Sequence, residues 1–285
     1  MNGRYTLTVS KDGNGSYMTI QEALDAVPYM VPATITVKEG IYREKLFSDK
    51  HDLVIRGEGK VLITFSDGAR ELLADGRKRG TFRSYTAFFS GEKLHLENLT
   101  IQNTAGRGCD AGQAVALYLD VDESHLVNVN LMEHQDTLFL APLPDEEREE
   151  RGFYGPRCFL PRKRTYTLFE GGSISGGVDF IFGGGDAIFR NAEIISVEKG
   201  FVTAPSGKKD WDGLTFEDCT FTSPLDVDGE IYLMRPWRDE GKARFVRCTF
   251  GRHISKDGFI AWPGRADKAH LSSFSMEECL SLIHI

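Results

Sequence analysis

Two aspartates stand at equivalent places in a weak internal repeat and could act together on a substrate. Asp136 follows Asn128 by eight residues (136 − 128 = 8), and Asp179 follows Gly171 by the same number (179 − 171 = 8). Equal offsets on adjacent coils of a parallel stack lie about 5 Å apart, which is the spacing between strands. Two carboxyl groups that close do not both ionise freely. The pair therefore predicts a proton donor beside a nucleophile; the alternative is two ordinary turn residues.

The repeat that positions these aspartates reads apolar, any, polar, any, any, apolar. Its register residues are Asn98, Asn128, Gly171, Asn191, Asp218 and Arg247. The steps between them are 30, 43, 20, 27 and 29 residues long. Such steps are typical of a solenoid, in which each coil buries one face against the next, and the longest step carries an insertion. Short runs rich in Val, Ile, Phe and Thr, broken by Gly, Asn and Asp, indicate strands. We therefore expect an all-β fold, a single-stranded right-handed parallel β-helix.

A short helix is expected to cover the first coil. Thr19 and Glu22 have capping-box spacing, in which the hydroxyl and the carboxylate satisfy free amide groups at a helix start. The apolar residues that follow recur at helical spacing up to Pro28. We expect this helix to plug the open end of the solenoid.

Composition limits the classes of function. The chain has 285 residues, of which 41% are apolar, so it can bury a large core, and no linker interrupts it. A net charge of −8 argues against a nucleic-acid partner. No run is long enough to span a membrane, and the five cysteines do not have zinc-site spacing. Cys219 and Cys248 share an offset and are expected to stack on neighbouring coils, where a disulfide is possible. We predict no metal and no cofactor.

Five motifs in a fixed order resemble the pectin methylesterase (pectinesterase) family, over the span from Thr6 to about Trp262. They are Gly40-Ile41-Tyr42-Arg43-Glu44, Gln113-Ala114-Val115-Ala116-Leu117, Gln135-Asp136-Thr137-Leu138, Asp179-Phe180-Ile181-Phe182-Gly183 and Arg235-Pro236-Trp237. The resemblance implies a β-helix enzyme that hydrolyses methyl esters of galacturonate units in pectin and releases methanol without a cofactor.

The resemblance also implies a role for each residue of the site. Asp179 is the expected nucleophile, and protonated Asp136 is the expected general acid and later the base. Gln113 and Gln135 match the amides that donate hydrogen bonds to the oxyanion. Arg235 matches the arginine that pairs with the nucleophile. Because a neighbouring guanidinium lowers the pKa of a carboxyl group, Asp179 is the aspartate expected to stay charged.

Three aromatic residues match positions that line the substrate groove of the family. Trp237 is expected to stack on a sugar ring, and Phe139 stands where a Tyr is common. For Phe182 a place in the core is equally favoured, because Phe180 and Phe182 alternate onto one face of a strand. The charged run 145–151 is expected to be a solvated loop, with a border of the groove as the alternative.

Two other features near the motifs have structural interpretations. His134 suggests a serine hydrolase, but the Gly-x-Ser-x-Gly elbow is missing, so a structural role is expected. Gly183, Gly184 and Gly185 are interpreted as a tight turn of the solenoid.

The C-terminal region is expected to differ from the rest. Similarity to the family fades after Trp262, and residues 280–285 match the translation of a sequencing adapter. We therefore expect one domain over 1–279, truncated at its C-terminus, and a non-native tail over 280–285.

Competing functions remain open from the residues. A β-helix polygalacturonase would also use close aspartates, but its motifs are missing. A lyase would need a calcium site, and a non-catalytic polysaccharide-binding solenoid would tolerate loss of Asp179 or Arg235. The expected partner is pectin or methylated oligogalacturonate. Because the first residues do not form a signal peptide, we expect the protein in the cytoplasm of a bacterial cell. A monomer is the default expectation.

Overall fold

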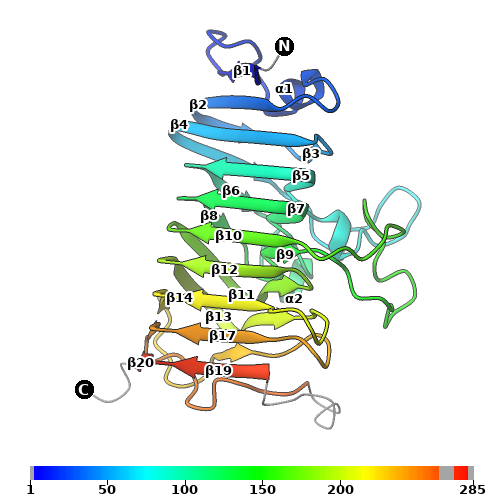
Figure 1. Ribbon diagram of the computed structural model, residues 1–285. Helices are drawn as coiled ribbons and strands as arrows, with labels where there is room; N and C mark the ends of the chain where they lie inside the picture. Colours follow the sequence, from blue (N-terminus) through cyan, green and yellow to red (C-terminus); the bar gives the residue numbers. More distant parts are fainter. Residues whose placement is uncertain (1–2, 263–272, 282–285) are drawn as a thin grey trace.

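The protein is described here by a computed structural model, which covers residues 3–262 and 273–281. Strands succeed one another from β1 at one end of the molecule to β19 at the other, as rungs of one continuous stack (Figure 1). Every pair of named strands in the described residues is parallel. The molecule is thus the all-β parallel β-helix that the repeat predicts.

The coils carry three stacks of strands, and long strands bend from one stack into the next. The first stack contains β1 (Tyr5–Val9), β2 (Ala33–Arg43), β4 (Asp52–Phe65), β5 (Ala87–Glu97), β7 (Leu117–Val127), β10 (Tyr166–Glu170), β12 (Asp186–Arg190), β14 (Leu214–Glu217), β17 (Ala243–Val246) and β19 (Phe274–Glu277).

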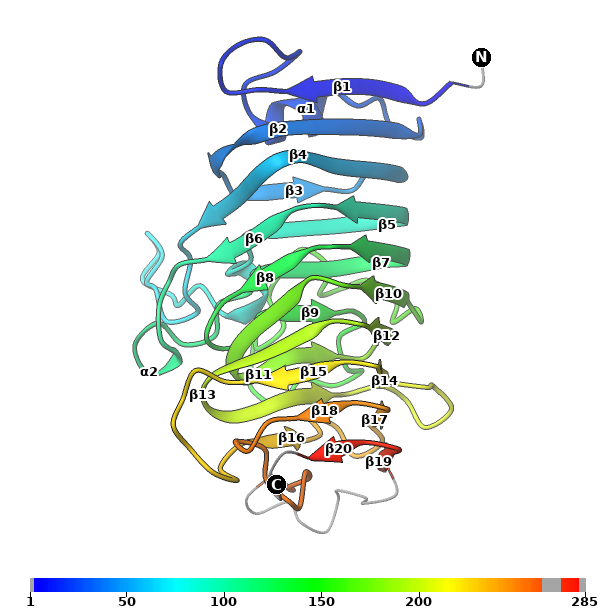
Figure 2. The same ribbon diagram turned by 90° about the vertical axis from the view of Figure 1, so that its left-hand side faces the viewer.

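The second stack faces the viewer in Figure 2. It continues the ends of β2 and β4 through β6 (Thr100–Asn103), β8 (Asn130–Met132), β11 (Ser173–Gly183), β13 (Glu193–Pro205), β15 (Thr220–Thr222), β18 (Thr249–Phe250) and β20 (Leu280–Ser281). The third stack joins β3 (Leu46–Ser48) to the starts of β5 and β7, to β9 (Leu138–Leu140), to the ends of β11 and β13, and to β16 (Tyr232–Met234).

The register residues of the repeat form one corner of the solenoid, between the first and second stacks. All six adopt a left-handed backbone with φ between 51° and 65°. Gly and Asn tolerate this conformation best, which explains why four of the six are Gly or Asn. The corner recurs once more at Glu278, where φ is 53°. The coils therefore continue past the last repeat found in the sequence.

Apolar side chains fill the interior of the coils and stack from rung to rung. Two residues before the last three register residues, an aromatic column runs through Phe189, Phe216 and Phe245, with ring centroids 4.5 and 4.9 Å apart. Cys219 and Cys248 are buried beside this column on neighbouring coils, as expected, and both are free thiols. The core is thus a ladder of like residues.

The expected N-terminal helix is present as α1 (Ile20–Ala26), and it buries Ile20, Ala23 and Leu24. Thr19 caps it by accepting a hydrogen bond from the Glu22 amide. Glu22 does not satisfy the free amides, because it accepts the Thr19 hydroxyl instead. The carboxylate of Glu44 accepts the amides of Ile20 and Gln21 at 3.1 and 2.9 Å. The partner expected from spacing is therefore replaced by one from a later coil.

Two long connections project from the same side of the stack (Figure 1). The first, between β4 and β5, carries the 3-10 helix η1 (Thr81–Arg83); the shorter connection between β6 and β7 carries α2 (Gly108–Ala111). The second long connection, 141–165, lies between β9 and β10 and is held by the Arg162 guanidinium, which donates to the carbonyl oxygens of Pro144, Arg157, Cys158 and Leu160. This connection is the insertion that lengthens one step of the repeat.

The C-terminal expectation falls partly on described residues. Leu280 and Ser281, which we expected to be non-native, form β20 and pair with β18. Residues 282–285 lie outside the described part of the chain, and the domain boundary at 279 stays a prediction. In the described residues no helix has the length and apolar character needed to cross a membrane.

Candidate active site

The two aspartates lie opposite each other on adjacent coils, at the entrance to the third stack. Gln135 forms a bridge with Val178, and Leu138 pairs with Ile181, so the register matches Asp136 with Asp179. The Asp136 amide donates to the Val178 carbonyl at 3.1 Å. Both aspartates have a left-handed backbone, with φ of 70° and 50°. The chain turns at these residues, and the equal offsets correctly predict that they are neighbours.

Arg235 binds the carboxylate of Asp179 through two parallel hydrogen bonds. Its Nε and Nη2 atoms lie 3.2 and 2.5 Å from the two Asp179 oxygens. The guanidinium is held between the rings of Phe201 and Trp262, each 3.7 Å from its central carbon. A bidentate pair with a clamped guanidinium fixes the orientation of the carboxylate as well as its charge.

Burial raises the pKa of both carboxyl groups, and the charges of neighbouring residues make the two pKa values differ. The pKa of Asp136 lies well above its usual range because burial, the charge of Asp179 and the charge of Glu133 all disfavour ionisation. The pKa of Asp179 is also raised by burial, whereas Arg235 opposes that rise. The net shift on Asp179 is upward, contrary to the lowered pKa expected from the sequence, because burial outweighs the guanidinium. Asp179 still ionises before Asp136.

Two amide side chains border the aspartate pair. Gln113 lies between α2 and β7, and its backbone carbonyl oxygen accepts the Ala69 amide at 2.8 Å. Gln135 immediately precedes Asp136, and its side chain passes so close to Gly108 that a Cβ there would lie 2.2 Å from the Gln135 Oε1. Both side chains line the same cleft as the aspartates. The structure therefore brings together all five polar residues expected at the site.

The aromatic residues divide into cleft and core. Trp237 lines the cleft and packs against Phe182 at 6.0 Å. Phe182 also reaches the cleft but is 97% buried, with a relative exposure of 3%. Phe139 does not line the cleft: it is fully buried against Phe182 and Phe82, so its expected contact with substrate is wrong.

Phe180 and Phe182 do not share a face, contrary to expectation. Phe180 belongs to the interior core of the coils, whereas Phe182 belongs to an outer aromatic cluster. The strand pairing shifts register between Val178 and Ile181, next to the left-handed turn at Asp179. Strict alternation does not hold through such a bend.

The cleft has a volume of about 510 Å³, and its wall includes residues outside the five motifs. The insertion contributes Arg148, Glu149 and Phe153 to its wall, so the charged run 145–151 does border the groove. Sequence reasoning held this border only as the alternative, and it missed Phe153, Phe82 and the other lining residues Thr81, Gly152, Ala204, Arg238 and Trp262. No repeat register applies to a projecting loop, so only the unusual step of 43 residues pointed to it.

His134 and the glycine run have the structural roles expected of them. The His134 ring lies 2.9 Å from the Glu198 carboxylate, and its carbonyl oxygen accepts the amides of Gly177 and Val178. Gly183 has φ of 126°, and a Cβ there would lie 2.0 Å from the Leu140 carbonyl oxygen. This close approach makes the turn from β11 to β12 specific for glycine.

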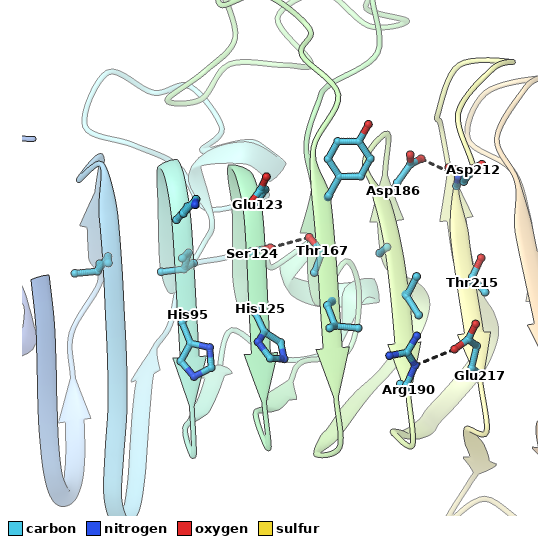
Figure 3. Close-up of a pocket in the computed structure, with 18 of the residues that line it drawn as sticks. His95, Glu123, Ser124, His125, Thr167, Asp186, Arg190, Asp212, Thr215 and Glu217 are labelled. Carbon is cyan, nitrogen blue, oxygen red and sulfur yellow. Dashed lines mark hydrogen bonds and ion pairs between the residues drawn. The ribbon is translucent and has the colours of Figure 1, made fainter. Parts of the chain in front are cut away.

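A second and larger hollow lies over the outward face of the first stack, with a volume of about 1130 Å³ (Figure 3). Its polar side chains are largely paired with one another. The Ser124 and Thr167 hydroxyls are 2.8 Å apart, and Arg190 binds Glu217 at 2.9 Å. Ionised carboxylates held by arginines on an open sheet do not form an acid–nucleophile pair, so the smaller cleft is the better candidate.

Comparison with known proteins agrees with this architecture. The pectinesterase family model matches residues 6–154 and 160–278. Probable pectinesterase/pectinesterase inhibitor 23 from Arabidopsis thaliana is 32% identical over 274 residues, which cover 90% of this chain and 43% of that protein. Pectinesterase 31 from the same plant is 29% identical over 95% of this chain and 81% of its own length.

Solved structures give the same result for the fold. Pectin methylesterase from Aspergillus niger superposes with a TM-score of 0.79 at 24% identity, covering all of this chain and 87% of that one. A pectin methylesterase in complex with a hexasaccharide matches with a TM-score of 0.78 over 99% of this chain and 91% of its own. The common feature is the parallel β-helix fold.

A parallel β-helix with a buried aspartate pair beside a clamped arginine is the class of protein that the fold and the site define. The chain belongs to the pectinesterase family, whose model covers most of its length. The match continues to residue 278, so similarity does not end near Trp262 as we expected. The chain covers 43% of the length of probable pectinesterase/pectinesterase inhibitor 23, which is less than half of that relative.

Proposed function

We propose that the protein hydrolyses methyl esters of galacturonate units in pectin or oligogalacturonates and releases methanol. The observation that carries this proposal is the asymmetric aspartate pair: Asp179 is held by Arg235, whereas Asp136, buried beside it, pairs with no cation among the described residues. An ester carbonyl needs a nucleophile, a proton donor and hydrogen bonds to the oxyanion. The cleft lined by Gln113 and Gln135 supplies all three.

In the first half of the reaction, ionised Asp179 attacks the carbonyl carbon of the ester. The negative charge passes to the carbonyl oxygen, where the amides of Gln113 and Gln135 donate hydrogen bonds. Removal of one such donor typically costs about 3 kcal/mol of transition-state stabilisation. As the intermediate collapses, Asp136 gives its proton to the departing methoxide oxygen. Methanol leaves, and an anhydride joins Asp179 to the sugar.

In the second half, Asp136 is a carboxylate and acts as a base. It takes a proton from water, and the water oxygen attacks the sugar carbonyl of the anhydride. The bond to Asp179 breaks, so that Asp179 leaves as a carboxylate that Arg235 again binds. The product leaves as the free acid, which gives its carboxyl proton to the solvent to become galacturonate, and Asp136 is protonated for the next cycle.

Short methylated oligogalacturonates are the proposed substrates within this class. A cleft of about 510 Å³ falls in the range of sites that enclose one small ligand. Trp237 offers a half-buried aromatic face on which a sugar ring can stack. The bacterial cytoplasm and the monomeric state stay predictions, which fractionation of host cells and sedimentation of the purified protein check.

The test is methanol release from highly methylated pectin and from short methylated oligogalacturonates. The wild type is compared with Asp179→Ala and Asp136→Ala, each checked by circular dichroism. We expect release by the wild type and a loss of at least about 1,000-fold in both variants, because each removes a reacting group. Product chain length is measured in the same samples.

Three outcomes would overturn the proposal. A folded wild type that binds the oligomers without releasing methanol would indicate a polysaccharide-binding solenoid. Shortened chains without methanol would indicate a polygalacturonase. Release that persists in both variants would place the chemistry elsewhere in the molecule.

A further inference from the structure

Glu133 is a buried carboxyl group that the proposed reaction does not use. Its relative exposure is 4%, and it lies three residues before Asp136, at the end of β8. One of its oxygens, Oε2, accepts the backbone amides of both His134 and Gln135. The other, Oε1, is buried without a hydrogen-bond partner in the described residues. Such a group is costly to bury, so its presence needs a reason.

The backbone that Glu133 holds is shared by both aspartate-bearing turns. The His134 carbonyl oxygen accepts the amides of Gly177 and Val178 at 2.5 and 3.1 Å. The Val178 carbonyl oxygen accepts the Asp136 amide at 3.1 Å. The Glu133 carboxyl group therefore holds the peptide units just before Asp136. The carbonyl oxygen of one of these units, at His134, also accepts the hydrogen bonds from the turn that leads to Asp179.

Both turns need such support, because their conformations are unfavourable for residues other than glycine. Asp136 and Asp179 have φ of 70° and 50°. A left-handed backbone at such a residue costs of order 1 kcal/mol and persists only when the surroundings impose it. The two amides held by Glu133 immediately precede the first of these turns.

We propose that Glu133 is a positioning residue, which holds the Gln135–Asp136 segment in the geometry that the aspartate pair requires. This inference rests on the proposed esterase function for its kinetic consequences. Its structural consequences do not depend on that function. The carboxyl group acts through the backbone, since its partners are amides and not the reacting atoms.

The charges around Glu133 give the residue a second effect on the site. Glu198 of β13 faces it with negative charge, and burial with that charge raises the pKa of Glu133 to about 8. Asp136 is its other acidic neighbour, and Glu133 raises the pKa of Asp136 in turn. Arg235 lowers the pKa of Asp136, and Glu198 is paired with the His134 ring and with Arg107 at 2.9 and 2.8 Å.

Two variants separate positioning from charge. Glu133→Gln keeps a carbonyl oxygen for both amides but cannot ionise, whereas Glu133→Ala removes the acceptor. We expect Glu133→Ala to lower kcat by about 10- to 100-fold with little change in KM, because small misplacements of reacting groups have effects of this size. Glu133→Gln should keep kcat within about threefold at its own optimum, because the acceptor remains.

The pH profile supplies a measurement that a merely structural role would not change. Asp136 must be protonated to act as an acid, so activity falls as pH rises through its pKa. Glu133 is ionised only above its pKa of about 8, and there its negative charge disfavours ionisation of Asp136; Glu133→Gln removes this charge on the alkaline side of the profile. The basic limb of Glu133→Gln should therefore move to lower pH. The control is Glu193→Ala, which removes an exposed carboxylate bound to Thr222 and should leave rate and profile unchanged.

Hydrogen exchange tests the positioning without any activity. We expect Glu133→Ala to lose amide protection in residues 133–137 and 176–180, while other coils stay protected. Full protection in both segments, or kcat of Glu133→Ala equal to the wild type, would overturn the inference. If Glu133→Ala does not fold, loss of protection in both segments of Glu133→Gln, which keeps the acceptor, would overturn it instead. Absence of methanol from the wild type would refute the proposed function alone, since exchange still decides the positioning.

Discussion

At the scale of single residues, the site depends on two identical side chains in different surroundings. Asp136 and Asp179 are both buried, with exposures of 7% and 8%, and both have a raised pKa. Within the part of the chain that the structure describes, a guanidinium binds the two oxygens of Asp179 and none binds Asp136. Arg235 thereby decides which carboxyl group ionises first, and this assignment can be tested.

Replacement of Arg235 by Gln should lower kcat/KM by about 100-fold or more, because the positive charge that orients the Asp179 carboxylate is lost. The variant should also move the acidic limb of the pH profile upward. Asp179 must be ionised to attack, and without Arg235 its pKa rises further, so a higher pH is needed. The measurement is kcat/KM for methanol release between pH 4 and 9.

Arg235→Lys is the matched control for this experiment. It keeps a positive charge but cannot form two parallel hydrogen bonds or stack in the same way between Phe201 and Trp262. We expect its acidic limb to move less than that of the Gln variant while its rate still falls. An acidic limb that stays in place in Arg235→Gln would contradict the proposed ordering of the two aspartates.

Stability should also depend on pH through Glu133. Its pKa is about 8 in the folded protein, against 4.5 for the free group. The folded state thus holds a proton that the unfolded state releases over this interval, and stability falls as pH rises from about 4.5 to 8. Glu133→Gln lacks that titration, so urea unfolding should show a flatter decline. Parallel curves for the two proteins over this interval would argue against a buried, proton-holding Glu133.

Residue positions were predictable where the repeat fixes them and unpredictable where the chain leaves it. The equal offsets placed Asp136 opposite Asp179, because register in a parallel stack follows from spacing. Phe139 was misplaced because its family position indicates the groove, whereas in this chain Phe82 from the β4–β5 connection covers it. Contacts made by long connections carry no periodic signal.

At the scale of elements, α1 shows how tertiary contacts replace a local pattern. Thr19 and Glu22 correctly marked the start of the helix, but Glu44 satisfies its first amides. A capping box can be recognised from four residues. A carboxylate that arrives from the junction of β2 and β3 cannot, because nothing in the local sequence refers to it.

We therefore expect Glu44→Ala to destabilise the protein more than Glu22→Ala. Loss of Glu44 leaves two amides of a partly buried helix start without their acceptor, which should cost about 1–2 kcal/mol. Loss of Glu22 removes an exposed contact with Thr19 and should cost about 0.5 kcal/mol or less. Urea unfolding of both variants measures the difference, and equal losses would favour the capping box expected from spacing.

The insertion 141–165 should determine how tightly the cleft holds its substrate. Phe153 packs against Phe82 and Trp237 at 5.9 Å each and lines the cleft. We expect Phe153→Ala to raise KM about 2- to 10-fold with little change in kcat, because aromatic contacts are lost at a distance from the reacting atoms. Steady-state methanol release measures both constants.

Phe159→Ala is the control, since Phe159 lies in the same insertion and is 90% exposed. It should leave KM unchanged. A fall in kcat without a rise in KM for Phe153→Ala would instead assign the insertion to the reaction step.

At the scale of the whole molecule, the sequence predicted the stack of coils but not its extent. Glu278 continues the left-handed corner 31 residues after Arg247 (278 − 247 = 31), and Cys279 follows it as Cys248 follows Arg247. The template missed this coil because Ser281 stands where the final apolar residue is required. A pattern read from apolar positions fails at a rung where fewer side chains are buried, and on this rung Met276 and Leu280 are both exposed.

In a stack of this kind, a destabilising substitution should affect only the substituted coil and its neighbours. Phe216 is fully buried between Phe189 and Phe245, so Phe216→Ala removes stacking on both sides and should cost about 3–5 kcal/mol. Ile188→Ala, on the outward face of β12 and 37% exposed, should cost less than about 1 kcal/mol. Because coils contact only their neighbours, hydrogen exchange should increase in β12, β14 and β17 and stay slow in β2, β4 and β5. A uniform increase along the whole stack would mean that the solenoid unfolds as one cooperative unit.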